Sequence, residues 1–172
     1  MRAALELLYR TSGRLAGFFL VAIALLSLAQ IGGRLLGFAA HSFDEFAGYC
    51  MAASSFLGLA YTLRASEHIR MTLVVHRTRG AARQALELAC LAASVLLVGF
   101  FAWYAADMVW FSYATHDVSQ GLVPIALWVP QTGMALGLAI LLVALLDDLV
   151  VVLTGGAPTH DRALGAGPGF ER

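Results

Sequence analysis

Long apolar runs separated by short polar connections dominate the hydrophobic pattern of this chain. Four runs stand out, at residues 15–36, 46–63, 86–111 and 122–146. About 20 residues of helix cross a hydrocarbon core of about 30 Å, so each run is long enough to span a bilayer. Backbone N–H and C=O groups find no water there and must pair within their own segment. The pattern therefore predicts an all-α integral membrane protein with four transmembrane helices.

The same pattern predicts how the chain is divided. Residues 1–154 form one membrane domain, and residues 155–172 form a glycine-rich tail that we expect to be flexible. Residues 4–15, just before the first run, carry arginines among leucines. We expect them to form a short amphipathic helix that lies on the membrane surface.

Composition supports a membrane protein. Hydrophobic residues make up 60% of the 172 positions and charged residues only 13%, against roughly 25% charged in soluble proteins. The formal net charge is zero, so the chain has no bulk attraction for nucleic acid. We expect the lipid bilayer, and no nucleic acid, to be among its partners.

Basic residues lie almost entirely on one side of the predicted membrane domain. If the helices alternate in direction, the N-terminus, the connection between the second and third helices and the tail share one side. That side holds all of the 11 basic residues except Arg34. Cytoplasmic segments of membrane proteins carry the excess of Lys and Arg. Both termini, the tail included, are therefore predicted to be cytoplasmic.

The connection between the second and third helices has the pattern of an interfacial helix. Its sequence, LRASEHIRMTLVVHRTRGAAR, runs from Leu63 to Arg83. Apolar or small residues recur there at helical spacing, with arginines largely on the other side: Met71, Val74, Val75, Thr78 and Ala82 against Arg70, Arg77 and Arg83. Such a segment lies along anionic headgroups with its apolar side down. We predict an amphipathic cytoplasmic segment here.

Residue patterns for catalysis or cofactor binding are missing. The five histidines fall in the connections and the tail, whereas a haem between membrane helices needs imidazoles that project from those helices. Walker A, GxSxG and HExxH patterns do not occur. We expect no catalytic residue, no metal site, no cofactor and no enzyme. A stand-alone small membrane transporter, or a quinone- or haem-associated redox subunit, stays open as an alternative function.

Small residues four positions apart mark candidate helix-packing faces. They are Ser54 and Gly58 in the second run, and Gly133 and Gly137 in the fourth. Small side chains let membrane helices approach one another closely. These four residues therefore form a candidate helix-packing interface, including one with a partner protein.

Residues 44–72, DEFAGYCMAASSFLGLAYTLRASEHIRMT, resemble the signature of the small membrane subunit of the TRAP (tripartite ATP-independent periplasmic) transporters, the DctQ family. The later run PIALWVPQTGMALG resembles the fourth helix of that family. The residues that carry the resemblance are Glu45, Phe56, Gly58, Arg64, His68, Ile69, Arg70, Pro124 and Trp128. Thr72 departs from it, because many relatives have an aspartate there.

The resemblance implies the small permease subunit of a sodium-coupled symporter in the cytoplasmic (inner) membrane of a bacterium or archaeon. In this family a periplasmic binding protein delivers an organic acid to a large, DctM-type membrane subunit. The small subunit packs on the scaffold of the large one and stabilises it. We therefore expect the outer connections to hold a candidate periplasmic docking surface, made of Asp44, Glu45, His116 and Asp117.

Overall fold

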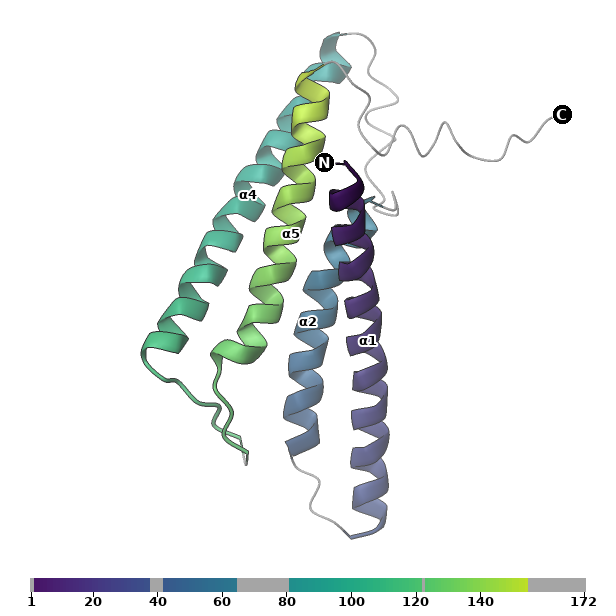
Figure 1. Ribbon diagram of the computed structural model, residues 1–172, viewed down its shortest axis with the longest axis vertical. Helices are drawn as coiled ribbons and strands as arrows, with labels where there is room; N and C mark the ends of the chain where they lie inside the picture. The colour runs from purple at the N-terminus through teal and green to yellow at the C-terminus, as the bar shows by residue number, and fades with distance from the viewer. Residues whose placement is uncertain (1, 38–41, 65–80, 122, 155–172) are drawn as a thin grey trace, which may run out of the picture.

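The computed structural model describes residues 2–37, 42–64, 81–121 and 123–154, which contain four helices. They are α1 (Arg2–Leu35), α2 (Ser42–Arg64), α4 (Ala81–Ala114) and α5 (Trp128–Leu153) (Figure 1). All four are long and apolar enough to cross a membrane. The described residues contain one isolated β-bridge and no strand. The predicted all-α fold with four membrane-spanning helices is confirmed.

Two predicted segments lie outside the described residues. They are most of the amphipathic connection, at residues 65–80, and the tail at residues 155–172. The cytoplasmic position of both termini stays a prediction, based on the arginine distribution.

Helix α1 differs from the expectation for residues 4–15. These residues do not form a separate surface helix, because α1 runs without a break from Arg2 to Leu35. The reason is its packing: Tyr9, Ser12 and Ala16 follow one another at helical spacing and all three are buried. One continuous face of the helix is therefore packed across the point where the hydrophobic run begins.

Helix α5 begins later than its hydrophobic run. It starts at Trp128 rather than at residue 122, and it ends at Leu153. Just before it, the backbone N–H of Leu127 donates to the carbonyl oxygen of Asp117, 2.9 Å away. Ala126, the residue before Leu127, is in a β-bridge with Val118. The residues ahead of Trp128 therefore pair with the connection that follows α4, and the helix begins only after them.

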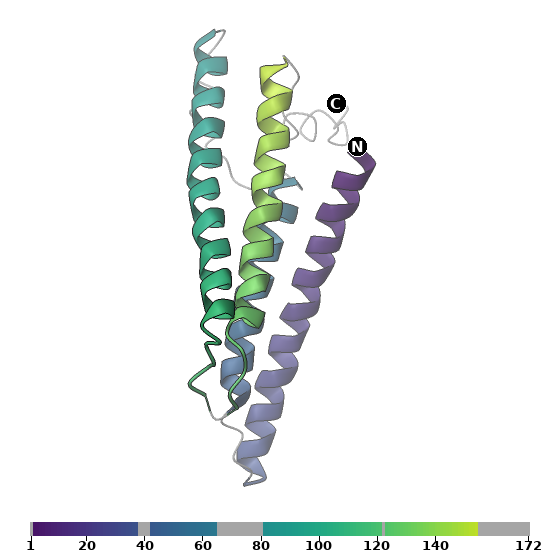
Figure 2. The same cartoon turned by 60° about the vertical axis from the view of Figure 1, so that its left-hand side comes forward.

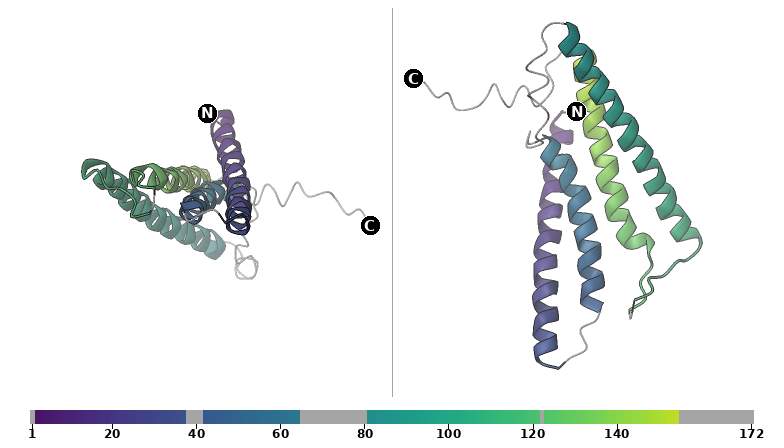
Figure 3. Two further views of the ribbon diagram at one scale, coloured as in Figure 1. Left: turned by 90° about the horizontal axis from the view of Figure 1, so that it is seen from below. Right: turned by 180° about the vertical axis from the view of Figure 1, so that it is seen from behind.

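The helices pack in the spatial order α1, α2, α5, α4 (Figure 3). Helix α2 packs along α1 on one side and along α5 on the other, whereas α1 and α5 touch only marginally. Helix α4 packs along α5. The fold is therefore an open row with two inner helices, α2 and α5, and two outer ones, α1 and α4.

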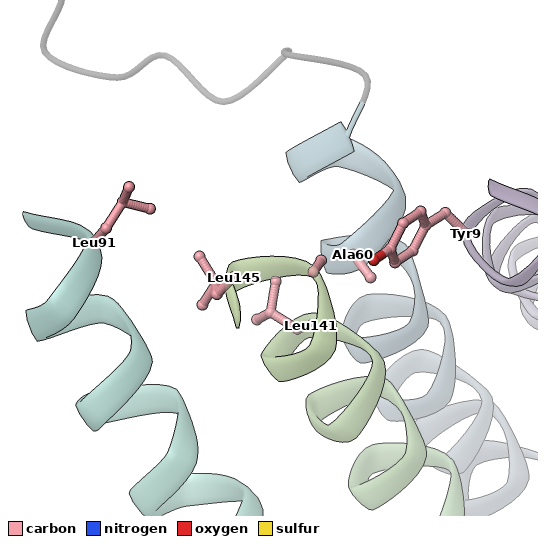
Figure 4. Close-up of a cluster of buried hydrophobic side chains, with 6 residues drawn as sticks. Tyr9, Ala60, Leu91, Leu141 and Leu145 are labelled. Atoms are coloured by element: carbon pink, nitrogen blue, oxygen red, sulfur yellow. The ribbon is translucent and has the colours of Figure 1, made fainter. Parts of the chain in front are cut away.

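A small core joins the four helices near the N-terminal end of α1 (Figure 4). Its labelled members are Tyr9 from α1, Ala60 from α2, Leu91 from α4, and Leu141 and Leu145 from α5. The exposed fraction of each side chain is 8% or less. This core fixes the row of helices at one end.

The two outer helices, α1 and α4, lie at the two sides of the row (Figure 2) and carry large apolar side chains that are exposed. Phe18 and Leu28 on α1, and Phe100 and Trp103 on α4, are each more than half exposed. Contiguous apolar surface of this kind is covered by lipid or by another protein. The outer helices are therefore suited to a membrane and to contact with a partner within it.

Two side-chain hydrogen bonds connect α1 and α2. The hydroxyl of Ser12 donates to the carbonyl oxygen of Leu57 at 2.5 Å, and that of Ser54 donates to the carbonyl oxygen of Ala16 at 2.9 Å. Each helix thus supplies one donor and one acceptor. Serines at such positions bring membrane helices close together and satisfy their own hydroxyls.

Replacing both serines by alanine (S12A with S54A) is expected to weaken the α1–α2 contact. Interhelical hydrogen bonds in membrane proteins contribute about 0.6 kcal/mol each, so the free energy of unfolding should fall by roughly 1 kcal/mol. Reversible unfolding in mixed micelles measures this change. Ser94→Ala is the matched control, because the Ser94 hydroxyl bonds Cys90 of its own helix at 2.8 Å. An equal loss in the control would contradict an interhelical role.

Candidate functional site

The predicted GxxxG pair of the fourth run lies where α5 crosses α2. A Cβ atom placed on Gly133 would stand 3.0 Å from Cβ of Ala53, and one placed on Gly137 would overlap the backbone of Phe56. Phe56, one of the resemblance residues, therefore meets α5 through its main chain. The two glycines allow α5 to lie directly against α2.

The other predicted pair, Ser54 and Gly58, faces α1. Besides the Ser54 hydrogen bond, a Cβ atom on Gly58 would stand 3.8 Å from Cβ of Ala16. All four predicted packing residues thus contact other helices of the same chain. An interface of these residues with a partner stays a prediction. By contrast, a Cβ atom placed on Gly32 or Gly48 would have nothing within 4 Å, so within the described residues these two glycines do not pack against another helix of the chain.

The connection between α4 and α5 is a short ordered hairpin, here called the α4–α5 hairpin, made of residues 115–121 and 123–127. Near its start lies His116, whose φ of 53° is in the left-handed region. The N–H of Asp117 bonds the carbonyl of Ser112 at 3.1 Å and that of His116 bonds the carbonyl of Tyr113 at 3.4 Å. This is the Schellman pattern that ends a helix. The chain therefore turns sharply out of α4 at His116.

Main-chain pairing holds the two arms of the hairpin, residues 117–119 and 125–127, together. Val118 and Ala126 form an antiparallel β-bridge, and the N–H of Ser119 donates to the carbonyl of Ile125 at 2.8 Å. At the tip, the Gly121 N–H donates to the Ser119 hydroxyl oxygen at 3.3 Å. The hairpin is thus ordered by its own main-chain hydrogen bonds.

Glu45, in the first turn of α2, ties that helix to the hairpin. The Tyr49 hydroxyl donates to Glu45 Oε1 at 2.6 Å, and the Ser119 side chain lies close enough to the same carboxylate to interact with it. A Cβ atom on Gly121 would overlap Glu45 Oε2. Hydrogen bonds to an ionised carboxylate are stronger than those between neutral groups. We call Glu45, Tyr49, Ser119 and Gly121 the Glu45 cluster.

The four predicted docking residues lie around this cluster. Asp44 is exposed in the first turn of α2, next to Glu45, while His116 is exposed and Asp117 half-buried in the hairpin. The structure therefore brings the two predicted connections together at one end of the helix row, through Glu45. The Glu45 carboxylate itself is directed to groups of its own chain.

Sequence reasoning missed three members of the cluster. Tyr49 had a usable signal, because it lies four residues after Glu45 on the same helix face. Ser119 and Gly121 had none, since they lie far along the chain in a connection whose fold no local pattern predicts.

Aromatic rings border the hairpin. Tyr113, near the end of α4, meets Trp128, the first residue of α5, edge to face with ring centroids 5.8 Å apart. Trp110 lies one turn before Tyr113, with centroids 6.3 Å apart. Such amphipathic rings are enriched at membrane–water interfaces. They are consistent with a bilayer surface at the level of the hairpin.

The remaining resemblance residues contribute less to this end of the molecule. Pro124 is exposed in the hairpin, and Arg64 is the last residue of α2. His68, Ile69 and Arg70 lie outside the described residues. Within the described ranges, no group of three His, Cys, Asp or Glu side chains could hold a metal ion.

Comparison with known proteins adds one finding. The family model described as "Tripartite ATP-independent periplasmic transporters, DctQ component" matches residues 7–155. The matched range includes nearly all of α1 and the whole of α2, α4 and α5. No curated protein and no solved structure matches the chain.

Proposed function

Because the chain belongs to the DctQ component family of the tripartite ATP-independent periplasmic transporters, we propose that it packs on the large, DctM-type membrane subunit and stabilises its scaffold. Membership makes the chain a small transporter component and not an enzyme. The uptake that this complex performs is sodium-coupled, and its substrate is an organic acid brought by a periplasmic binding protein.

The open row of helices is the observation that carries this proposal. Helices α1 and α4 each pack mainly on one neighbour and expose large apolar side chains on their other faces. In a bilayer there is little hydrophobic drive for helices to associate, so shape and packing decide which surfaces meet. The chain thus has a small core and two exposed apolar helix faces. Such a chain is suited to pack against a larger membrane protein and to extend its scaffold.

The α4–α5 hairpin, with Asp44 and Glu45 beside it, is the proposed docking surface for the binding protein. Arginine distribution predicts that this end faces the periplasm. The Glu45 cluster supports the proposal, because it holds the hairpin in one position against α2 before any partner arrives. A preorganised surface loses less entropy when it binds.

Neither of the other functions considered from the sequence gains an observation in its favour. A stand-alone transporter would act without partners, whereas the family to which the chain belongs is a component of a tripartite system. A redox subunit would need cofactor ligands that project from the helices. The transporter component is therefore the function that we propose.

Extraction of the tagged full chain from its native membrane in mild detergent tests the proposal. We expect a larger, multi-spanning membrane protein to copurify in a constant ratio, identified by mass spectrometry. Deleting the gene for that protein should then abolish uptake of the organic acid. Recovery of the chain alone after native expression would count against the proposal. So would uptake that survives deletion of the gene for this chain.

A further inference from the structure

A surface pocket lies between α1 and α2, toward the N-terminal end of α1 and away from the Glu45 cluster. Its volume is about 510 Å³, and it is lined by Arg10, Gly13, Arg14 and Tyr61. Arg10 and Arg14 are four residues apart, and therefore neighbours on one helix face. The pocket thus combines two arginine residues with one tyrosine.

Gly13 shapes the floor of this pocket. A Cβ atom at that position would stand 2.7 Å from both Cγ and Cδ2 of the Tyr61 ring, which is closer than real side-chain atoms come. The ring of Tyr61 therefore lies close against the main chain of α1 at Gly13. Tyr61 is 45% exposed, so its ring also forms part of the open pocket wall.

The depth of the pocket relative to a bilayer follows from the charge pattern of α1. After Arg14 the helix carries no charged residue until Arg34. The hydrocarbon core must therefore cover residues after Arg14, which places Arg10 and Arg14 at its boundary. Arginine side chains at such a boundary extend into the headgroup layer. Phospholipid phosphates lie at that same level.

Charge at the pocket is positive overall. Arg10 pairs with Glu6 at 3.1 Å, and both side chains of this pair are more than half exposed. An exposed pair of this kind is weak, and a guanidinium has five N–H donors, so Arg10 keeps donors for another anion. Arg14 makes no ion pair within the described residues. Among the residues that the structure describes, Arg14 is thus without an ion-pair partner and Arg10 is partly compensated.

Space for an apolar chain continues from the pocket toward the membrane centre. Gly17 lies one turn after Gly13, and a Cβ atom there would meet nothing within 4 Å. Phe18 and Val21, further along α1, are 65% and 58% exposed. A hydrocarbon chain can therefore pass along α1 directly below the arginines.

We propose that this pocket binds an anionic phospholipid. Arg10 and Arg14 donate hydrogen bonds to its phosphate oxygens, and the first methylene groups of one acyl chain pass over Gly17. Basic pockets between membrane helices are a known form of lipid headgroup site. Free phosphate shares the headgroup chemistry, but it would leave the apolar path past Gly17 without a role. The proposal does not depend on the transporter function.

Native mass spectrometry of the full chain in mild detergent tests this site, with added phosphatidylglycerol, phosphatidylcholine or inorganic phosphate. We expect phosphatidylglycerol to be retained in preference to phosphatidylcholine. Each arginine near the membrane surface is worth about fivefold in affinity. Since Glu6 offsets part of the Arg10 charge, R10Q with R14Q should lower retention of phosphatidylglycerol by about tenfold.

Two further variants separate the possible ligands. Arg34→Gln removes an exposed arginine near the other end of α1 and should leave retention unchanged. Gly17→Leu fills open space, so the chain should fold normally, keep both arginines and lose phosphatidylglycerol. Binding of inorganic phosphate with no effect of G17L on phosphatidylglycerol would show a free-phosphate site and overturn the proposal. Equal retention of the two lipids, or equal losses in R34Q and the double variant, would overturn it as well.

Discussion

Replacing Gly137 with leucine is expected to unfold the membrane domain or to separate α5 from α2. A Cβ atom at this position overlaps the backbone of Phe56, and a backbone cannot rotate away as a side chain does. Helix α5 must therefore shift, and Leu141 and Leu145, which follow it into the core, shift too. Overpacking costs about 1–3 kcal/mol where side chains can adjust, so we expect at least about 3 kcal/mol here.

Thermal unfolding, followed by size-exclusion chromatography in detergent, measures this effect. Gly32→Leu is the matched control, because it adds the same side chain to α1 where nothing lies within 4 Å. We expect G32L to behave like the wild type, while G137L gives little folded protein and no uptake. Similar melting of the two variants would mean that the α2–α5 contact is not the one described.

Glu45→Ala is expected to release the α4–α5 hairpin from α2. The change removes the carboxylate that accepts from the Tyr49 hydroxyl and lies against Gly121 of the hairpin. Hydrogen bonds to an ionised carboxylate are stronger than those between neutral groups. Losing the tether should therefore raise the hydrogen-exchange rate of backbone amides in residues 117–121 by about tenfold or more, while the four helices remain folded.

Hydrogen exchange with mass spectrometry gives this rate, and uptake is measured in parallel. Asp44→Ala is the matched control, because it removes an exposed carboxylate one residue away. Exchange in the hairpin should not change in D44A. Unchanged exchange in E45A would refute the tether. Faster exchange with normal uptake would instead keep the tether and refute the docking role of the hairpin.

A second variant approaches the same contact from the other side. Gly121→Val keeps the carboxylate but places side-chain atoms where Glu45 Oε2 lies. We expect it to mimic E45A in hydrogen exchange. Combining E45A with G121V should add less than the sum of the two effects, because both break one contact.

The resemblance residues show how far sequence reasoning reached. The family assignment made from the motif around Glu45, Gly58 and Arg64 agrees with the match over residues 7–155. The place of Glu45 at the start of a helix was predictable too. Its partners in the hairpin were not, because a contact between α2 and a connection far along the chain leaves no periodic signal in either segment.

The small residues show the same limit. Gly133 and Gly137 were identifiable as a packing face from their spacing alone. The helix that this face meets, and how tightly, depends on where the backbone of Phe56 lies. Likewise, the hydrophobic run began at residue 15, yet α1 begins at Arg2, since Tyr9 and Ser12 are buried against the rest of the fold.

By itself, the sequence determined the number of membrane-spanning helices that the described residues contain, that they suit a membrane, and the family of the chain. Run length decides the first two, because backbone groups in lipid must pair within a helix long enough to cross it. The tertiary structure alone decided the order α1, α2, α5, α4 and the position of the hairpin on Glu45. Lipid solvates an apolar helix equally well whichever helix packs beside it. The packing order therefore depends on close contacts at single residues, and these contacts depend on the positions of both helices.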